Sequence, residues 1–473
     1  MTTRSARSCW LTNALAALLL LAAAYGVFST PALVERWGTS PVGIVLTLVW
    51  AGLACRILAG AVRPPSRAEW AGLAVAAAAL RIGSALLAAN RVSPGDSAIY
   101  VELAQNGLAG RGLAIDDPWL GIAVRAFYPP LYPLLLAGWS WLAGFSTPSL
   151  LILSTAIDLL TAAAIVRLGE RVADRRIGVA TAALYLIWPA TLFSAPLAQK
   201  EGLGVALAVL LALAWCMAGE GRWWRRSLAI GVAAGLLALT QPGWAPLALA
   251  FGLAAWPRIG WRRMLAVGAP AAGVAAAVML PWWLRNGALF GAFVPLTSVS
   301  GLSLWIGNNP DATGRWMAYP AILHGLPELE VGRVAGGMAR RWIIAHPAEF
   351  VRLTLAKAIR ALGLAQSGVS RLSAMRPPIA PVYAAALLPL AQAAQTAMLA
   401  MTAAVLRFER RVPVAFLIAA LAHMLLVDVW FEFDERHRDV VTPFLLLTLV
   451  AGAAAWLRRR TAPAVAASAR PAA

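Results

Sequence analysis

Long apolar stretches separated by short arginine-containing segments dominate the pattern of this chain. A helix needs about 20 consecutive apolar residues to cross the hydrocarbon core of a bilayer. Twelve stretches meet or approach that length, and two of them share the break Gln241-Pro242-Gly243, which predicts a tight hairpin. The predicted spans cover residues 10–28, 42–60, 70–89, 149–166, 177–195, 202–218, 228–241, 243–256, 264–283, 380–405, 413–430 and 440–457.

The composition agrees with this pattern, since 60% of the 473 residues are hydrophobic and only 13% are charged. Soluble domains are about 45–50% apolar and about 25% charged. The sequence therefore predicts an all-α integral membrane protein and excludes a disordered chain, a collagen-like fibre and a disulfide-rich secreted scaffold. Cys9, Cys55 and Cys216 are scattered in or beside apolar stretches, with neither a disulfide framework nor the spacing of metal ligands.

The formal net charge is +19, but the basic residues lie between apolar stretches, as in the cytoplasmic loops of multispan proteins, so we expect no nucleic-acid partner. With a cytoplasmic N-terminus every short basic loop falls inside, and both termini are cytoplasmic. A cleaved signal peptide at residues 10–28 would leave the next basic loop without its partner span. Because the chain is rich in Arg and Ala and poor in Lys, we expect a bacterial inner (plasma) membrane. The inside loops contain Arg63, Arg67, Arg171, Arg176, Arg225, Arg258, Arg263, Arg410 and Arg411.

Two regions assigned to the outer face, at about 90–148 and 284–379, are too long to be simple connectors, and long ordered loops usually carry function. The apolar stretch 131–144 in the first region is too short to span, so we expect it to lie at the interface or to re-enter. The expected organisation is two extra N-terminal spans in 1–69, a main module in 70–457 and a basic, disordered cytoplasmic tail in 458–473.

Carboxylates mark the first outer region. Asp96 follows a Pro-Gly turn, before an expected interfacial helix that begins near Ser97. It is either the cap of that helix or a catalytic carboxylate held just outside a membrane helix. Asp116 and Asp117 either bind a divalent metal or form a solvated turn with the following proline.

Basic residues that could hold a phosphate stand at the outer ends of several spans. Each also has a purely structural interpretation, as an interfacial anchor or as part of a solvated loop. Glu201, beside the first of them, is a further candidate. The four basic candidates are Lys200, Arg285, Arg436 and Arg438.

Arg81 and Asp158 are ionisable residues inside predicted spans. Such residues are costly in a membrane and are functional candidates by default. Neither has a partner that the sequence reveals, and Asp158 could equally make a structural polar contact inside the bundle.

In this order the motifs resemble those of the GT-C superfamily of polyprenyl-phosphate-sugar-dependent glycosyltransferases. The nearest resemblance is to the protein O-mannosyltransferase and aminoarabinose transferase families, of the glycosyltransferase family 39 type. The matching segments cover about residues 70 to 457. They are Asp96-Ser97-Ala98-Ile99-Tyr100, Tyr128-Pro129-Pro130-Leu131-Tyr132, Glu201 after Pro196, Pro281-Trp282-Trp283-Leu284-Arg285-Asn286 with Gly307-Asn308-Asn309-Pro310, and Glu435-Arg436-His437-Arg438.

The resemblance implies a GT-C-like helical bundle in which Asp96 is the catalytic residue and a lipid-linked sugar is used on the outer face. We expect the donor phosphate on the four basic candidates, and the acceptor or a metal at Asp116, Asp117 and Glu201. The chain departs from the family pattern in its two extra N-terminal spans and in His437, where relatives often have Tyr. The expected substrate-loop residues are Tyr100, Tyr128, Asn286, Asn308, Asn309 and His437.

These features predict a hexosyl- or pentosyltransferase that moves a sugar from a polyprenyl-phosphate donor to a hydroxyl of a glycan, lipid or protein, with inversion. Asp96 would act as the base, and fixed cations or a divalent metal ion (Mg or Mn) would stabilise the leaving phosphate. The alternatives are a multispan transporter or flippase, a polysaccharide ligase or polymerase, and a non-catalytic assembly protein. The two halves of the chain lack similarity and the motif residues cluster outside, which speaks against transport.

Overall fold

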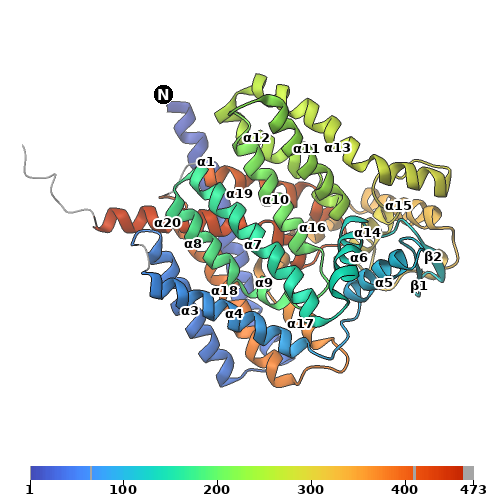
Figure 1. The fold of residues 1–473 in the computed structure, drawn as a ribbon, viewed down its shortest axis with the longest axis horizontal. Coiled ribbons are helices and arrows are strands. Elements are labelled where there is room, and N and C mark those ends of the chain that lie inside the picture. Colours follow the sequence, from blue (N-terminus) through green and yellow to red (C-terminus); the bar gives the residue numbers. More distant parts are fainter. Residues whose placement is uncertain (1, 64–65, 409–411, 462–473) are drawn as a thin grey trace, which may run out of the picture.

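A computed structural model of the chain describes residues 2–63, 66–408 and 412–461 (Figure 1). Arg410, Arg411 and residues 462–473 of the expected tail lie outside the described residues. Regular structure in the first half is helical except for one short antiparallel pair of strands. Its elements are α1 (Thr2–Phe28), α2 (Thr30–Trp37), α3 (Pro41–Gly60), α4 (Arg67–Ala88), α5 (Asp96–Leu108), β1 (Ile115–Asp117), β2 (Ile122–Val124), α6 (Leu131–Ala143), α7 (Thr147–Val172), α8 (Arg175–Leu186), α9 (Pro189–Ser194), α10 (Glu201–Cys216) and α11 (Trp223–Thr240).

The second half is also helical, and short 3₁₀ turns interrupt it. Its elements are η1 (Pro242–Trp244), α12 (Leu247–Ile259), α13 (Trp261–Phe290), α14 (Ser300–Gly307), η2 (Ala321–Leu323), α15 (Glu328–Ala345), α16 (Pro347–Gly363), α17 (Ser367–Ser373), α18 (Pro381–Val405), α19 (Val412–Leu426), η3 (Asp428–Trp430), η4 (Glu435–Val440) and α20 (Thr442–Thr461).

Among the described residues, seven helices are long and apolar enough to cross a bilayer. They turn large apolar side chains outward, such as Leu48, which is 66% exposed, and Val75, which is 68% exposed. Such faces need lipid rather than water around them, so the prediction of an all-α integral membrane protein is confirmed. The seven segments are Trp10–Phe28, Pro41–Gly60, Arg67–Ala88, Thr147–Val172, Trp261–Phe290, Pro381–Val405 and Pro413–Trp430.

The expected count of twelve spans is not confirmed, because several apolar stretches form shorter helices. The stretch 177–195 is divided into α8 and α9 at Pro189, which starts α9 but has no N–H to continue a helix. The break at Gln241 is present, since α11 ends at Thr240 and η1 follows. However, α11 packs chiefly on α13 and α12 on α19, rather than on each other.

The loops assigned to the cytoplasm gather at one end of the bundle. Arg458 pairs with Asp174 at 2.8 Å, and Arg263 donates to the carbonyl of Ala218 at 2.9 Å. Arg171 lies in the same group, where it pairs with Glu220 and its own carbonyl accepts from Arg258 in the last turn of α12. These segments are far apart in sequence, and their contacts bring them to the same end of the bundle.

The first outer region and the part of the second up to α15 form one module, which Figure 1 shows at the right as α5, α6, α14, α15 and the two strands. Their apolar side chains share one core, whereas those of α16 and α17 belong to the core of the helical bundle. Glu328, at the start of α15, accepts from the backbone N–H groups of Arg125 (2.7 Å) and Ala126 (2.8 Å) and from the Ser298 hydroxyl (2.6 Å). This carboxylate therefore ties the first outer region to the second. The 13-residue helix α6 is too short to span, as expected.

The N-terminal helices pack closely through glycines, α1 against α16 and α18, and α3 against α18. A Cβ on Gly26 would lie 2.7 Å from the carbonyl oxygen of Gly363, and one on Gly43 would lie 2.7 Å from that of Ala386. Small residues allow this approach between helix backbones in membranes. The segment before residue 70 is thus part of the bundle, with an additional short helix, α2, between its two long ones.

Candidate active site

Asp96 begins α5 directly after Gly95, whose φ of 66° provides the turn into the helix. The carboxylate of Asp96 does not cap α5, because the N-cap position belongs to Gly95 and no side chain bonds there. It pairs instead with Arg436 of η4, with Nη1 donating to Oδ2. The Asp96 side chain keeps 28% of its surface exposed and Arg436 keeps 17%, so this pair is reachable from outside.

Arg436 is surrounded by acids from three segments. Its Nε lies 3.6 Å from Oε1 of Glu201, at the start of α10, and its Nη2 lies 3.9 Å from Oε1 of Glu432. Lys200, next to Glu201, places its Nζ 5.8 Å above the ring of Tyr100. The structure therefore brings together four of the residues predicted from the sequence: Asp96, Lys200, Glu201 and Arg436.

The pKa values in this cluster follow from burial and from its two cations. Loss of hydration raises the pKa of Asp96, but Arg436 and Lys200 outweigh it and hold that pKa at about 2. Burial likewise raises the pKa of Glu201, while Arg436 and then Arg371 hold it below its usual value. Burial lowers the pKa of Lys200, although Glu201 and Asp96 oppose that effect. Asp96, Glu201 and Arg436 are therefore charged at neutral pH.

Aromatic side chains form the wall beside this cluster. Tyr100 is buried and meets Tyr128 and Tyr132 edge to face, with ring centroids 6.2 and 5.4 Å away. The sequence-predicted residues Tyr100 and Tyr128 thus lie at the site, and Tyr132 joins them. Sequence reasoning missed Glu432 and Arg371, because neither belongs to a motif that resembles the family.

A buried lysine supports the segment that carries Arg436. Lys357 of α16 donates from Nζ to the carbonyls of Gly307 and Phe431, each at 3.2 Å. It is fully buried, and burial lowers its pKa to about 7. The same segment passes close to Gly307, where a Cβ would meet the backbone of Phe431. The turn of residues 307–310 thus positions the loop before η4.

Other predicted site residues lie away from this cluster or have local partners. Arg285 sits 4.5 Å from the ring centre of Trp282 and donates to Oδ1 of Asn286 at 2.9 Å. Arg438 is buried and donates to the main-chain carbonyls of Ala361, Leu362 and Leu364. Neither guanidinium faces Asp96, so neither joins the cluster.

The polar loop residues mainly hold backbone in place. The side-chain amide of Asn308 donates to the carbonyls of Leu304 and Trp430, and that of Asn309 donates to the carbonyl of Trp305. Nδ1 of His437 accepts from the backbone N–H of Asp434, and burial lowers the pKa of His437 to about 3.

Asp117 forms the turn of the first outer region, with Oδ1 accepting from the N–H groups of Trp119 and Leu120, each at 2.9 Å. Asp116 is exposed on the same short strand. Across the described ranges no group of three His, Cys, Asp or Glu side chains gathers as metal ligands. The residues present do not fit a metal site, and we derive no step through a metal ion.

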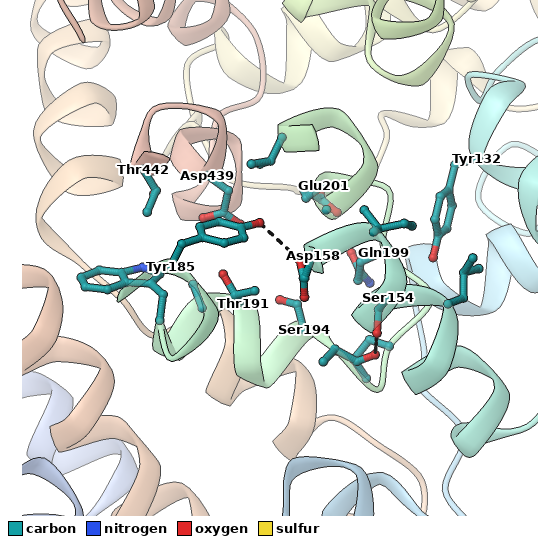
Figure 2. A pocket seen from close by; sticks show the side chains of 18 residues that line it. Tyr132, Ser154, Asp158, Tyr185, Thr191, Ser194, Gln199, Glu201, Asp439 and Thr442 are labelled. Atoms are coloured by element: carbon teal, nitrogen blue, oxygen red, sulfur yellow. Dashed lines mark hydrogen bonds between the residues drawn. The ribbon is translucent and has the colours of Figure 1, made fainter. Parts of the chain in front are cut away.

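A small pocket of about 50 Å³ lies beside the cluster, between α7, α9, α10 and the start of α20 (Figure 2). Glu201 lines it, so the pocket and the Arg436 cluster share this carboxylate. Asp158 also lines it and accepts from the Tyr185 hydroxyl at 3.2 Å. Oδ2 of Asp158 pairs with Nη1 of Arg81 at 2.8 Å, which gives both ionisable residues of the spans a partner.

No protein-family model and no curated protein matches the chain. Among solved structures, it is similar to the oligosaccharyltransferase AglB from Archaeoglobus fulgidus in complex with an inhibitory peptide and a dolichol-phosphate. That match has a TM-score of 0.46 and 16% identity and covers 84% of this chain and 52% of that one. A second oligosaccharyltransferase structure from this organism, with Zn and sulfate, gives a TM-score of 0.47 and 17% identity over 80% and 49%.

The chain is also similar to ArnT from Cupriavidus metallidurans bound to undecaprenyl phosphate, with a TM-score of 0.40 and 14% identity over 84% of this chain and 79% of that one. It spans about half the length of the two oligosaccharyltransferases. At these identities and scores the likeness is distant.

Proposed function

We propose that this chain is a membrane glycosyltransferase that takes its sugar from a polyprenyl-phosphate donor, as the GT-C resemblance of its motifs implies. The observation that carries the proposal is the convergence of Asp96, Lys200 and Arg436 from three distant segments. The reaction needs a base and positive charge that stabilises a phosphate leaving group. A carboxylate beside two fixed cations can provide both.

Lys200 and Arg436 are the groups that would hold the donor phosphate. Arg436 is charged at every accessible pH and its planar fork suits phosphate oxygens. In the structure this guanidinium pairs with Asp96. A phosphate competes for the same N–H groups, and when it takes them Asp96 loses its principal counter-ion. Since loss of hydration raises the pKa of Asp96, the freed carboxylate becomes a stronger base.

Asp96 then accepts the proton of the acceptor hydroxyl as that oxygen forms a bond to the anomeric carbon. The bond between this carbon and the phosphate oxygen breaks, and polyprenyl phosphate leaves with the electron pair. Lys200 and Arg436 stabilise the negative charge that develops on the leaving oxygen. One displacement from the opposite side inverts the anomeric configuration. A positioned base of this kind typically contributes about 10²–10⁴-fold to the rate.

The proposed setting is the outer face of a bacterial inner membrane, with both termini in the cytoplasm. The arginine-rich end of the bundle suits the cytoplasmic side, and Asp96, which pairs with Arg436, begins helix α5 of the outer module. The acceptor would be a hydroxyl of a glycan, lipid or protein, and the transferred group a hexose or pentose.

The test is transfer of radiolabelled sugar from purified polyprenyl-phosphate sugars by membranes that contain the full chain. We expect Asp96→Asn to lower transfer by about 10²-fold or more, because the amide cannot take the proton. Glu102→Gln is the matched control, since Glu102 is an exposed carboxylate on the same helix, α5. Equal transfer by wild type and Asp96→Asn would remove Asp96 from the mechanism. Lipid movement without sugar transfer would favour a flippase.

A further inference from the structure

Two exposed tryptophans, one from each outer region, pack against each other. Trp119 lies in the turn between β1 and β2, and Trp316 lies in the loop between α14 and η2. Their ring centroids are 4.9 Å apart and the ring planes meet at 62°, edge to face. Each residue nevertheless keeps 49% of its surface exposed. Tyr319 meets Trp316 in the same way at 6.4 Å, so the three rings form one surface, here named the aromatic platform.

Hydrogen bonds to the backbone hold both loops of the aromatic platform in place. Oδ1 of Asp117 accepts from the N–H of Trp119 at 2.9 Å and fixes the first turn. The N–H of Phe433 donates to the carbonyl of Gly314 at 2.8 Å, two residues before Trp316. Because the rings are already positioned, a ligand that binds them pays little for ordering the protein.

The aromatic platform lies close to the Asp96 cluster. Phe433, which is bonded to the loop of the platform, stands three residues before Arg436. Burial raises the pKa of Tyr319, and nearby acids that include Asp96 raise it further. Burial also raises the pKa of Tyr128, as do the charges of Asp96 and Tyr319. Tyr128 is thus near both groups, and aromatic side chains lead from the cluster to the exposed indoles.

The position of the aromatic platform differs from that of a membrane anchor. Figure 1 shows β1 and β2, whose turn contains Trp119, at the right end of the molecule and the end of α20 at the left. The end of α20 belongs to the arginine-rich group, through Arg458. Anchoring tryptophans form a belt where spans leave the hydrocarbon core. A place at the far end of the outer module favours a ligand from water.

A sugar is the ligand that fits two half-exposed indoles best. One face of a sugar ring presents C–H groups, which pack on an indole face while the hydroxyls stay in water. An acyl chain binds in a concave site that buries most of its surface. An extended peptide is held by main-chain hydrogen bonds along a strand edge, and β1 and β2 have only three residues each.

We propose that the aromatic platform binds a saccharide chain as the acceptor, with an inner sugar on Trp119 and Trp316 and the reacting hydroxyl of the terminal sugar at Asp96. This inference rests on the proposed glycosyltransferase function. It names the class of acceptor, a glycan of two or more sugars. Both tryptophans are positioning residues, since neither touches the reacting atoms.

The first test is binding of free oligosaccharides to the purified full chain in nanodiscs, without donor, followed by saturation-transfer NMR. The probes are trisaccharides of glucose, galactose, mannose, arabinose and N-acetylglucosamine, and a serine-rich peptide. We expect at least one trisaccharide to bind, and its monosaccharide to bind tenfold or more weakly. Absence of binding by every trisaccharide would overturn the proposal. Binding of the peptide alone would assign the platform to a protein and overturn it as well.

Trp119→Ala and Trp316→Ala should each weaken trisaccharide binding by about tenfold or more, because a stacked tryptophan is typically a dominant contact. Trp316→Phe keeps an aromatic face and should retain most of the affinity. Trp141→Ala is the matched control, since Trp141 is 77% exposed and lies on α6, outside the aromatic platform. It should bind within twofold of wild type. Wild-type affinity in both alanine variants of the platform would overturn the proposal.

Oxidation of the indoles by hydroxyl radicals, measured by mass spectrometry, tests the site without any substitution. Trp119 and Trp316 should be oxidised in nanodiscs, and the bound trisaccharide should slow their oxidation threefold or more. Indoles that the bilayer already protects in the absence of sugar would be membrane anchors, which would overturn the proposal.

Sugar transfer separates failure of this inference from failure of the proposed function. With the bound oligosaccharide as acceptor, Trp316→Ala should raise the acceptor KM tenfold or more and leave kcat within threefold of wild type. Transfer that requires Asp96 but shows the wild-type acceptor KM in both alanine variants would overturn the acceptor platform and leave the proposed function standing. A chain that binds the oligosaccharide and transfers no sugar from any donor would overturn the proposed function and the acceptor role together.

Discussion

Arg436 pairs with Asp96 across 340 residues of sequence, and the contact joins the start of the first outer region to the turn before the last helix. Both residues stand on short helices, α5 and η4, rather than inside spans. Without a donor, the Asp96 carboxylate is therefore paired with the same guanidinium that would bind the donor phosphate. Several properties of this pair can be measured.

Replacement of Arg436 by Met should expose the titration of Asp96. The wild-type pKa of about 2 leaves Asp96 ionised over the whole neutral range, so kcat/KM should not fall there on its account. In Arg436→Met the carboxylate stands with Glu201 and Glu432 without their shared cation, and its pKa rises. Since the base must be deprotonated, activity is then lost as the pH falls through this higher pKa, and the acid limb of kcat/KM moves upward.

The pH dependence of kcat provides a second test. It reports the pKa values of groups in the donor complex, whereas kcat/KM reports those of the free enzyme. If the donor phosphate takes Arg436, the acid limb of wild-type kcat lies at higher pH than that of kcat/KM. Arg315→Met is the control, since Arg315 pairs with Asp434 and Glu435 and not with Asp96. An Arg436→Met profile with the wild-type shape would contradict the assigned pair.

The sequence predicted much of this site but not its pairing. Asp96, Lys200, Glu201 and Arg436 were each identified from motifs, yet no local rule brings residues together across such a separation. Arg436 and Arg438 looked equivalent in sequence. They differ because η4 is a 3₁₀ turn with three residues per turn, so positions two apart point in different directions. Arg436 meets Asp96, and Arg438 meets the carbonyls at the C-terminal end of α16.

For the fold too, the sequence predicted local features but not contacts between distant segments. Apolar length predicted the long helices, the break at Gln241 and the short α6, because these depend on local composition. The shorter helices around Pro189, the packing of α11 on α13 and the role of Glu328 depend on neighbours far along the chain. The partners Arg81 and Asp158 are likewise distant in sequence, and only the packing of α4 beside α7 brings them together.

Asp158→Asn should destabilise the bundle, because it leaves the Arg81 guanidinium buried without its counter-ion. Both side chains are nearly inaccessible, at 7% and 6% exposure. Breaking a buried pair from one side typically costs about 3–5 kcal/mol, whereas replacing both partners by apolar residues is often neutral. Thermal unfolding in detergent should therefore show a large loss for Asp158→Asn and recovery in the double variant Arg81→Met/Asp158→Leu.

Glu69→Gln is the control for that pair, since the Arg56–Glu69 bridge is 34% and 43% exposed, and such pairs contribute about 0–1 kcal/mol. If Asp158→Asn unfolds at the wild-type temperature, the pair has no structural role. Selective loss of sugar transfer in that variant would then point to the pocket that Asp158 lines.

Glu328→Ala should loosen the contact between the two outer regions. The carboxylate accepts from the N–H groups of Arg125 and Ala126 and from Ser298, and its removal leaves these donors unpaired at about 1–3 kcal/mol for each buried group. Hydrogen exchange should become faster at residues 125 and 126. Glu330→Ala, on the same helix, breaks only an exposed bridge to Arg333 and should leave exchange at those residues unchanged.

Gly43→Leu should disrupt the packing of α3 on α18, while Gly52→Leu on the same helix should be tolerated. A Cβ at Gly43 would lie 2.7 Å from the carbonyl oxygen of Ala386, whereas one at Gly52 would meet nothing within 4 Å. Overpacking of this kind costs about 1–3 kcal/mol or more, because a backbone atom cannot move aside as a side chain can. The measurement is the unfolding temperature of both variants in the same detergent. Equal stability of the two would mean that α3 does not approach α18 closely, and that the N-terminal segment sits beside the bundle rather than within it.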